Sequence, residues 1–384
     1  MISPFIINDK NLFLDRFPTG QVNRSLQAWD AADEYLINYL QQEHTPSDEQ
    51  EPEPKKILIF NDSFGTLSCN LSQHQLYCVN DSYLSHQGIE HNLEQNSLSD
   101  EHITLLSSLD DLPSDINIVL YKIPKGKGLL CQQLTKIKQQ LNKDVVFIAA
   151  DRAKEIHSST LKLFENYLGT TTTSLAVKKA RLVFCQLDND KALSASFLTS
   201  WPLENTDFTL HNHANVYARE KLDIGARYFM QNLPNVAKDS QVIDLGCGNG
   251  VIGLQVLSKQ PEAHVHFIDE SYMAIASAEL NITENLPTAL EQCQFQVNDC
   301  LTSVEGGSVD LILCNPPFHQ QTATTDHIAW QMFKDSHRVL KKGGELRIIG
   351  NRQLGYHIKL QRIFGNEKLI ASNDKFVTIS AIKR

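Results

Sequence analysis

The second half of the chain alternates short apolar runs with segments of helical periodicity. The apolar runs predict strands at Gln241–Leu245, His264–Ile268, Gln292–Val297, Val309–Cys314 and Glu345–Ile349. The periodic segments predict helices at Gly250–Lys259, Tyr272–Glu284 and Thr325–Leu340, the last of them ended by Gly343 and Gly344. Strand and helix in alternation are typical of a doubly wound α/β domain built on a parallel sheet.

The C-terminal end departs from this alternation. Two strand-like runs, Glu367–Ser372 and Lys375–Ile382, flank Asn373 and Asp374. Asn and Asp are favoured in tight turns between paired strands. The pattern predicts a hairpin, so that the last strand runs antiparallel to its neighbours.

The first half repeats the second with an offset that drifts through 185, 189, 193 and about 195 residues. The matching pairs are Ile57–Gly65 with Val242–Gly250, Asn80–Tyr83 with Asp269–Tyr272, Val119–Pro124 with Ile312–Pro317, and Thr172–Leu187 with the C-terminal hairpin. A chance match of two α/β patterns is the alternative. The common order and the shared Ser-Tyr pair favour a duplication with small insertions.

The polar and glycine positions of the second half are mostly replaced in the first. Of the three glycines at 246, 248 and 250, only the last has a counterpart in the first half, which is Gly65. Asn80 stands at the position of Asp269, and Lys122-Ile123 at the position of Asn315-Pro316. We therefore expect the first half to bind no cofactor. With the boundary in the irregular stretch 189–208, the predicted domains are a degenerate one at 1–200 and one that keeps the polar and glycine positions at 201–384.

Charge is distributed unevenly along the chain. The net charge of −10 argues mildly against a general nucleic-acid binder. An acidic, proline-containing stretch at 43–54 contributes to this total, whereas residues 334–384 hold twelve Lys or Arg and four Asp or Glu. The candidates for phosphate contacts in this basic region are Lys334, Arg338, Lys341, Lys342, Arg347, Arg352, Lys359 and Arg362. Arg352 is the best of them, because it follows a strand end; a solvated helix face is the alternative for the others.

Several classes of protein are disfavoured by what the sequence lacks. No stretch approaches the roughly 18 apolar residues of a membrane span, and the N-terminus does not resemble a signal peptide, so we expect a cytoplasmic protein. The eight cysteines form no Cys-x-x-Cys pair. We therefore expect free thiols and no metal. A monomer is the default expectation.

A glycine-rich loop follows the first strand of the second half. Gly246, Gly248 and Gly250 permit a tight turn and a close approach of ligand to backbone. Dinucleotide sites use a related loop, but the carboxylate of Asp244 beside it would repel a pyrophosphate. The combination favours a cationic ligand that carries an ammonium and a sulfonium group.

Three further side chains are candidates for holding this ligand. Asp269 ends the next strand, 25 residues after Asp244, where an acidic residue can accept both hydroxyls of a ribose. Asp299 closes the third strand and is a candidate acceptor for an adenine amino group, with a surface or capping carboxylate as the alternative. Tyr217 is a candidate cover for the ligand, with a core tyrosine as the alternative.

The strand Val309–Cys314 runs into Asn315, Pro316 and Pro317, at the sheet edge where open α/β sheets bind ligands. An exocyclic base amine is a poor nucleophile, because its lone pair is delocalised into the ring. Two acceptors aimed at its N–H bonds favour the pyramidal cation that develops on attack. The Asn315 side-chain oxygen and the Pro316 carbonyl are the candidate acceptors, and the prolines fix the direction of that carbonyl.

Phe318 and His319 complete this motif. Phe318 is placed to stack on a target base that is flipped out or single-stranded. His319 is a candidate for contact with the base or a phosphate, and a structural histidine is the alternative.

These residues together resemble the class I methyltransferases that modify exocyclic or amide nitrogens. Asn315-Pro316-Pro317-Phe318-His319 with a decayed N-terminal duplicate is similar to the bacterial guanine-N2 rRNA methyltransferases. Gln320-Gln321, Asn351-Arg352 and the closing 373–377 are more similar to the type that acts on 23S rRNA than to the type that acts on 16S rRNA.

The resemblance implies a fold, a cofactor and a partner. The fold is two tandem class I, Rossmann-like domains, the first degenerate, each a mostly parallel sheet that ends in an antiparallel hairpin. The cofactor is S-adenosylmethionine, held by Asp244, Gly246, Asp269 and Asp299, and the catalytic residues are Asn315–Phe318. The partner is 23S rRNA, which the N-terminal domain helps to hold.

Other functions share this motif. Adenine-N6 DNA methyltransferases and glutamine methyltransferases of release factors act on similar planar NH2 groups. The large α/β first domain disfavours the glutamine enzymes, and the lack of a recognisable target-reading domain disfavours the DNA enzymes. A non-catalytic RNA-binding assembly factor and a small-molecule methyltransferase are further alternatives. The first leaves the intact motif unexplained, and the second leaves the basic region unexplained.

Overall fold

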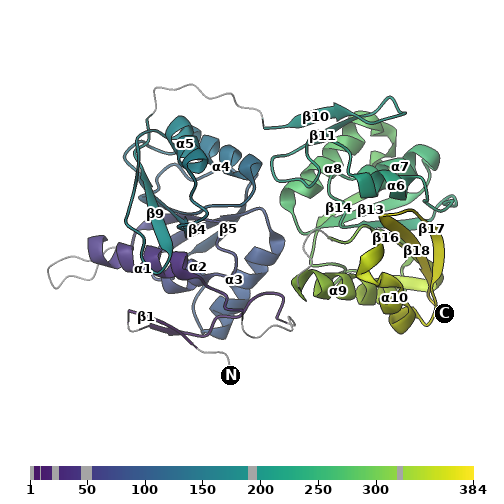
Figure 1. Cartoon of the computed structure of the whole chain (residues 1–384), viewed down its shortest axis with the longest axis horizontal. Coiled ribbons are helices and arrows are strands. Elements are labelled where there is room, and N and C mark those ends of the chain that lie inside the picture. The colour runs from purple at the N-terminus through teal and green to yellow at the C-terminus, as the bar shows by residue number, and fades with distance from the viewer. Residues whose placement is uncertain (1–3, 9, 20–25, 45–53, 189–196, 318–322) are drawn as a thin grey trace. The chain divides into compact units, whose positions relative to one another are not determined.

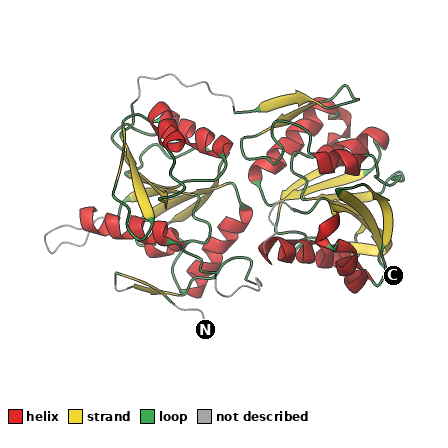
Figure 2. Cartoon of the chain, in the orientation of Figure 1, coloured by secondary structure: helices red, strands yellow, loops and turns green. Residues whose placement is uncertain are grey.

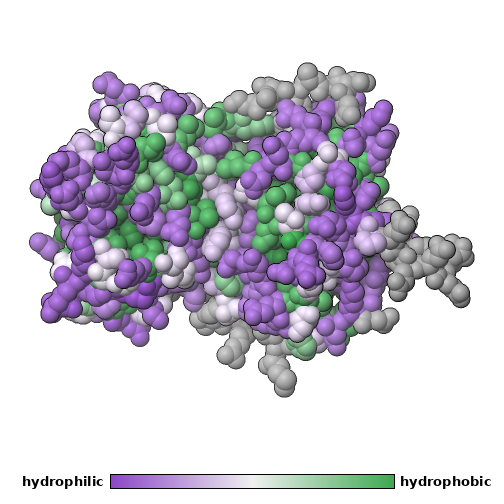
Figure 3. Space-filling view, turned by 180° about the vertical axis from the view of Figure 1, so that it is seen from behind, coloured by the Kyte–Doolittle hydropathy of each residue, from purple (hydrophilic) through white to green (hydrophobic). Residues whose placement is uncertain are grey.

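The computed structural model of the chain describes residues 4–8, 10–19, 26–44, 54–188, 197–317 and 323–384. The chain divides into two compact units, Met1–Phe197 and Leu198–Arg384 (Figure 1). In each unit, helices lie on both faces of a central sheet (Figure 2). On the face drawn in Figure 3, hydrophilic residues cover much of each unit, and smaller patches of hydrophobic residues interrupt them.

The second unit is built on a sheet of seven strands. Their order is β14 (Cys293–Val297), β13 (His264–Asp269), β12 (Gln241–Leu245), β15 (Val309–Cys314), β16 (Leu340–Asn351), β18 (Phe376–Ile382) and β17 (Lys368–Ser372). The first five run parallel, and β18 pairs antiparallel with both β16 and β17. The predicted C-terminal hairpin is therefore confirmed.

The first unit has a sheet with the same order and the same strand directions. Its strands are β5 (Ile103–Ser107), β4 (Gln75–Asn80), β3 (Lys56–Phe60), β6 (Ile118–Lys122), β7 (Val146–Arg152), β9 (Ala180–Cys185) and β8 (Thr171–Thr173). Again β9 is antiparallel to both of its neighbours. Two Rossmann-like units in tandem, as predicted from the repeat, are thus present.

Helices separate the strands in both units. The first unit has α1 (Ala31–His44), α2 (Thr66–Asn70), α3 (Tyr83–Gln95), α4 (Lys127–Gln140) and α5 (Ser158–Tyr167). The second has α6 (Ile224–Met230), α7 (Val251–Lys259), α8 (Tyr272–Asn285), α9 (Ala323–Val339), α10 (Tyr356–Phe364) and the short 3-10 turns η1 (Pro287–Gln292) and η2 (Arg352–Leu354). No helix in the described ranges is long and apolar enough to cross a bilayer.

Both faces of each sheet are buried, which explains the nearly continuous apolar runs of the central strands. In β3, Ile57 and Ile59 pack into one core cluster, whereas Leu58 and Phe60 pack into the cluster on the opposite face. Strands of a parallel sheet that is covered on both sides have this composition. All eight cysteines are free thiols, six of them buried.

One predicted boundary is wrong. The sequence places a strand at 345–349, but β16 begins at Leu340 and contains Gly343 and Gly344, which we expected to end the preceding helix. The pairing explains the difference, because Val309 pairs with Leu340 and Leu311 with Glu345. The extra residues of β16 form an irregularity at which Gly343 adopts a φ of +85°.

A two-stranded hairpin precedes each sheet. In the first unit it consists of β1 (Phe5–Ile7) and β2 (Lys10–Leu12), and in the second of β10 (Thr199–Pro202) and β11 (Thr209–Asn212). The second hairpin lies partly within the stretch that the sequence left irregular.

Two asparagines on α8 hold the second hairpin. The Asn285 side chain accepts from Thr209 N at 2.9 Å and donates to Thr209 O at 2.9 Å. Asn281 accepts from His211 N at 2.6 Å and donates to His211 O at 3.0 Å. Asn281 also donates to Asn249 O at 2.9 Å, in the glycine-rich loop. We call such a pair of asparagines, one turn apart on a helix, an asparagine clamp.

The first unit has the same clamp. Asn96 on α3 accepts from and donates to the backbone of Phe13, and Asn92 does the same with Asp15, all four bonds at 2.8 Å. Asn92 also donates to Phe64 O at 2.7 Å. Its residues stand 189 positions before Asn281 and Asn285 and its hairpin segment 196 positions before Thr209 and His211. The repeat therefore includes the hairpins, which the sequence pattern did not reveal.

We expect Asn281→Ala to lower the free energy of unfolding of the second unit by about 1–3 kcal/mol, because three backbone groups lose their partner and Asn281 is fully buried. Asn92→Ala should have the same effect on the first unit. Urea unfolding measures the loss, and hydrogen exchange at residues 209–212 locates it. The exposed Glu284→Ala on the same helix is the control. Equal unfolding midpoints for Asn281→Ala and Glu284→Ala would show that the clamp contributes nothing.

Candidate active site

The glycine-rich loop and the Asn-Pro-Pro motif lie side by side at the carboxyl edge of the second sheet. They follow two adjacent parallel strands, β12 and β15, in which Leu245 pairs with Cys314. A Cβ atom at Gly246 would lie 3.9 Å from the carbonyl oxygen of Asn315. The structure thus brings together the predicted cofactor loop and the predicted catalytic motif.

The three glycines of the loop serve different purposes. Gly246 and Gly248 have φ values of +69° and +54°, and a Cβ at Gly248 would meet nothing within 4 Å. Gly250 has a φ of +77°, but a Cβ there would lie 2.8 Å from the Cβ of Ala278. Gly248 therefore leaves open space beside the loop, whereas Gly250 is required by the close packing of α7 on α8.

Asp244 is buried at the end of β12, with 3% of its surface exposed. One of its oxygens accepts from Gly253 N at 2.8 Å. Burial raises the pKa of this carboxyl to about 8, and the nearby carboxylate of Asp269 adds to the rise. A positively charged group beside it would favour the ionised form, so Asp244 suits a cationic ligand.

Asp269 ends β13 and holds the loop. Its carboxylate accepts from Gly248 N at 2.9 Å and from Ser271 N at 3.0 Å. Burial raises the pKa of this carboxyl, and the backbone donors oppose the rise. Ser271 caps α8 by accepting from Ala274 N, and Ser82 caps α3 in the same way through Ser85 N. The serine shared by the two halves is therefore a helix cap.

Asp299 and Tyr217 already have partners. Asp299 accepts from Gln331 on α9 at 3.0 Å, and burial raises the pKa of its carboxyl. Tyr217 has 53% of its surface exposed and donates to Asp223, the cap of α6, at 3.1 Å. Gln331 was missed by the sequence reasoning, which had no signal for it. The predicted contacts of Asp299 and Tyr217 with a cofactor stay predictions.

Asn315 presents an unpaired acceptor at this edge. Its side-chain oxygen is buried and has no hydrogen-bond partner among the residues that the structure describes. Pro316 is buried and Pro317 is exposed. A buried polar atom without a partner is costly, so its retention suggests that a ligand completes it. Phe318 and His319 lie outside the described residues.

A buried amide network supports the glycine-rich loop. Asn249 donates to Asn212 at 2.9 Å, and its carbonyl accepts from Asn281 of the clamp. All three asparagines are buried. The sequence analysis missed them, although Asn281 stands on the apolar face of a predicted helix, next to Ile282. A polar residue at an apolar position of the helical period was the available signal.

Several of the candidate phosphate contacts form hydrogen bonds or ion pairs within the protein. Arg338 donates to Val304 O and Leu301 O, Lys341 pairs with Asp310, Arg347 pairs with Glu345 and donates to Asn232 O, and Arg352 donates to Asn373 O. Arg352 is nevertheless exposed and begins η2, directly after β16. Because β16 is parallel to β15, Arg352 lies at the same sheet edge as Asn315.

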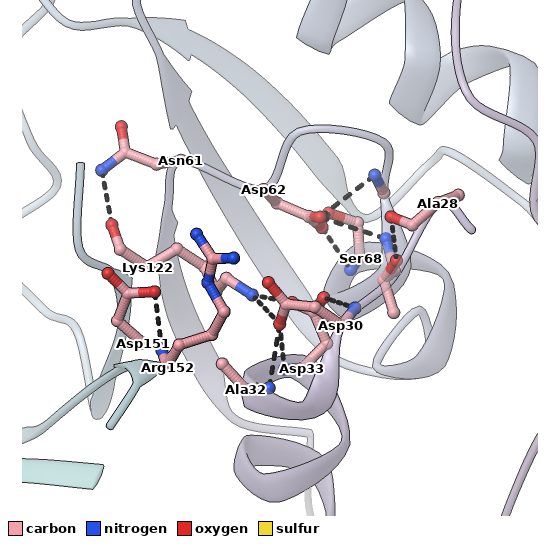
Figure 4. Close-up of polar contacts among 12 residues, drawn as sticks. Ala28, Asp30, Ala32, Asp33, Asn61, Asp62, Ser68, Lys122, Asp151 and Arg152 are labelled. Atoms are coloured by element: carbon pink, nitrogen blue, oxygen red, sulfur yellow. Dashed lines mark hydrogen bonds and ion pairs between the residues drawn. The ribbon is translucent and has the colours of Figure 1, made fainter. Parts of the chain in front are cut away.

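The equivalent edge of the first unit is filled by its own side chains (Figure 4). Lys122, at the position of Asn315, pairs with Asp30 at 2.9 Å and with Asp33 at 2.6 Å, both at the start of α1. Burial raises the pKa of Asp33 to about 6, whereas the two carboxylates raise the pKa of Lys122.

Asn61 and Asp62 form further hydrogen bonds at this edge. Asn61, at the position of Gly246, has a φ of +61° and donates its side-chain amide to Lys122 O at 2.8 Å. Asp62 accepts from the backbone of Gly65, Thr66 and Ser68. The first unit thus has a side chain that bonds Lys122 where the second unit has Gly246.

Both units match known families. Residues 3–189 match the RLMG N-terminal domain, and residues 207–380 match the methyltransferase small domain. The ribosomal RNA large subunit methyltransferase G of Colwellia psychrerythraea is 66% identical over 397 residues, covering 100% of both chains. The protein of the same name from Pseudoalteromonas translucida is 52% identical, covering 98% of this chain and 97% of that one. This chain belongs to the family of ribosomal RNA large subunit methyltransferase G.

Family membership confirms the resemblance that the motifs carried. A solved structure, the 16S rRNA N2 G1207 methyltransferase of T. thermophilus in complex with AdoMet and guanosine, covers 100% of this chain and 98% of that one with a TM-score of 0.77. At 18% identity this likeness shows the fold. In the part of the chain that the structure describes, no group of three His, Cys, Asp or Glu side chains is arranged to hold a metal ion.

We expect Lys122→Ala to lower the free energy of unfolding by about 3–5 kcal/mol, because it leaves Asp33 buried without its cation. Urea unfolding between pH 5 and pH 8 measures the loss. Without Lys122, the pKa of Asp33 rises further above its unfolded value, so the folded variant binds a proton as the pH falls. The loss should be complete near pH 8 and smaller below pH 6.

Lys154→Ala is the control, since the Lys154 side chain is 74% exposed and its contact with Glu155 spans 3.6 Å. A loss for Lys122→Ala that equals that of the control, or that grows as the pH falls, would contradict the ion-pair interpretation.

Proposed function

We propose that this chain methylates the N2 amino group of a guanine in 23S rRNA, with S-adenosylmethionine as methyl donor. The buried side-chain oxygen of Asn315, which has no hydrogen-bond partner among the described residues, carries the proposal. It lies at the carboxyl edge of the sheet, beside a loop with open space at Gly248. An acceptor held ready in this position suits an amine whose N–H bonds must be oriented during attack.

The residues of the loop fit S-adenosylmethionine. Asp244 provides a buried carboxyl group for the positive charges, Gly248 leaves room, and Asp269 is proposed to accept the ribose hydroxyls. Once bound, the cofactor supplies an electrophilic methyl group. In the first unit Asn61 stands at the position of Gly246 and Lys122 at the position of Asn315, so only the second unit is proposed to bind it.

Asn315 and Pro316 act on the base amine. The Asn315 side-chain oxygen and the Pro316 carbonyl accept hydrogen bonds from its two N–H groups. These bonds favour a pyramidal nitrogen, whose lone pair is no longer delocalised into the ring. The fixed backbone of the two prolines keeps the second acceptor in place. No general base is needed, because the product ammonium loses a proton to water readily. Phe318 is proposed to stack on the base, and His319 and Arg352 to contact the RNA.

The names of the close relatives support the large-subunit RNA as substrate. The guanine N2 position is supported by the Asn-Pro-Pro-Phe motif and by the N2 methyltransferase of T. thermophilus, which shares the fold. We propose that the first domain, at 1–200, has a structural or RNA-holding role and that the catalytic domain spans 201–384.

The direct test uses labelled S-adenosylmethionine with protein-free 23S rRNA, 16S rRNA, duplex DNA and a release factor. We expect label in 23S rRNA alone, and mass spectrometry of the digested RNA should identify N2-methylguanosine. Label in 16S rRNA alone would support the methyl transfer but show that the substrate is 16S rRNA and not 23S rRNA. Label on an adenine or in protein, or no label anywhere, would contradict the proposal.

Two variants separate catalysis from cofactor binding. We expect Asn315→Ala to lower kcat about 10²- to 10³-fold, as loss of one preorganised polar group does elsewhere, while its Kd for S-adenosylmethionine stays within about twofold of wild type. Asp269→Ala should raise that Kd, because it removes an acceptor and releases Gly248. Equilibrium binding and single-turnover rates give both quantities, with the exposed Asn142→Ala as control. Equal weakening of cofactor binding in both variants would refute the division of roles.

A further inference from the structure

A groove between α9 and α10 is lined by apolar and positively charged side chains. It has a volume of about 320 Å³ and is lined by Trp330, Leu354, Gly355, Ile358, Lys359 and Arg362. The lining carries two positive charges and no negative charge. Ile358 is 57% exposed and gives the groove an accessible apolar surface.

The groove belongs to the same edge of the second unit as the candidate active site. Leu354 and Gly355 follow the carboxyl end of β16, and α9 follows the Asn-Pro-Pro motif. Trp330 lies seven residues into α9, about 10 Å along its axis.

The helix α9 separates the groove from the cofactor loop. Gln331 bonds Asp299, and the methyl group of Met332 would lie 3.3 Å from a Cβ at Gly246. Trp330, Phe333 and His337, spaced by three and four residues, face α10 instead.

The chemistry of the groove is that of a site for a nucleotide. The Arg362 guanidinium carbon lies 5.6 Å from the centre of the Trp330 ring. Indole and guanidinium planes both stack on nucleobases, and Lys359 and Arg362 are suited to a phosphate. A groove for an apolar peptide would not need two cations beside its one tryptophan. Resting on the proposed function, the geometry points to this groove as the site that binds a single-stranded nucleotide of the substrate RNA, one that flanks the methylated guanine.

The test measures methyl transfer by the full chain to protein-free 23S rRNA. Stacking of one base contributes about 1–3 kcal/mol, so Trp330→Ala should raise KM for the RNA about tenfold, as should Arg362→Glu. The kcat at saturating RNA and the Kd for S-adenosylmethionine should stay within about twofold of wild type. Trp330→Phe retains an aromatic face and should restore most of the affinity.

The matched control is Lys259→Glu, an exposed charge reversal in the last turn of α7, at the opposite edge of the sheet. If the wild type transfers methyl groups and KM is unchanged in both groove variants, the proposed role of the groove is wrong and the proposed function stands. A fall in kcat or in cofactor affinity that matches the change in KM, or a Trp330→Phe variant as poor as Trp330→Ala, would also overturn it by showing a structural role. Absence of transfer by the wild type would instead overturn the proposed function.

Discussion

The asparagine clamp is the contact on which the active edge depends. An amide side chain offers a donor and an acceptor at once, and can therefore pair with both backbone groups of one extended residue. Asn281 adds a third bond, to the carbonyl of Asn249, and so connects the hairpin, α8 and the glycine-rich loop. That loop lies beside Asn315. Buried amides thus set the position of the glycine-rich loop beside the Asn-Pro-Pro motif.

The first unit keeps the asparagine clamp and the sheet but lacks the Asn-Pro-Pro motif and two of the three loop glycines. Its clamp makes the same bonds, and its sheet has the same order. Its edge, however, is closed by Asn61 and by the group of Lys122 with Asp30 and Asp33 (Figure 4). Where the second unit has Asn315, whose side-chain oxygen has no partner among the described residues, the first unit has Lys122, whose charge is paired with Asp30 and Asp33. The framework and the site are therefore separable parts of this fold.

For the second sheet the sequence predicted every strand except β16 to within one or two residues, because burial on both faces of a sheet leaves a continuous apolar run. It also placed Asp244, Asp269 and Asn315 at strand ends, which parallel pairing brings to one edge. It did not predict the helices of the first unit, α6, α10 or the two hairpins that precede the sheets. It also did not predict the partners of Lys122 or the bond from Gln331 to Asp299, because these depend on contacts between distant segments. The start of β16 was wrong because glycines signal a helix end and a strand irregularity equally well.

Gly250 and Gly65 show which position of the glycine-rich loop is fixed by helix packing. A Cβ at either position would lie 3.0 Å from the backbone of the neighbouring helix, at Ala278 or Ile89. Packing therefore requires a glycine at both positions, whereas Asn61 and Ser63 stand in the first unit where the second has Gly246 and Gly248. The glycines of one motif are thus required for different reasons: Gly250 for helix packing, and Gly248 for the open space beside the loop. A genome survey that weighted the last glycine most heavily would therefore also select degenerate domains that lack the other two glycines.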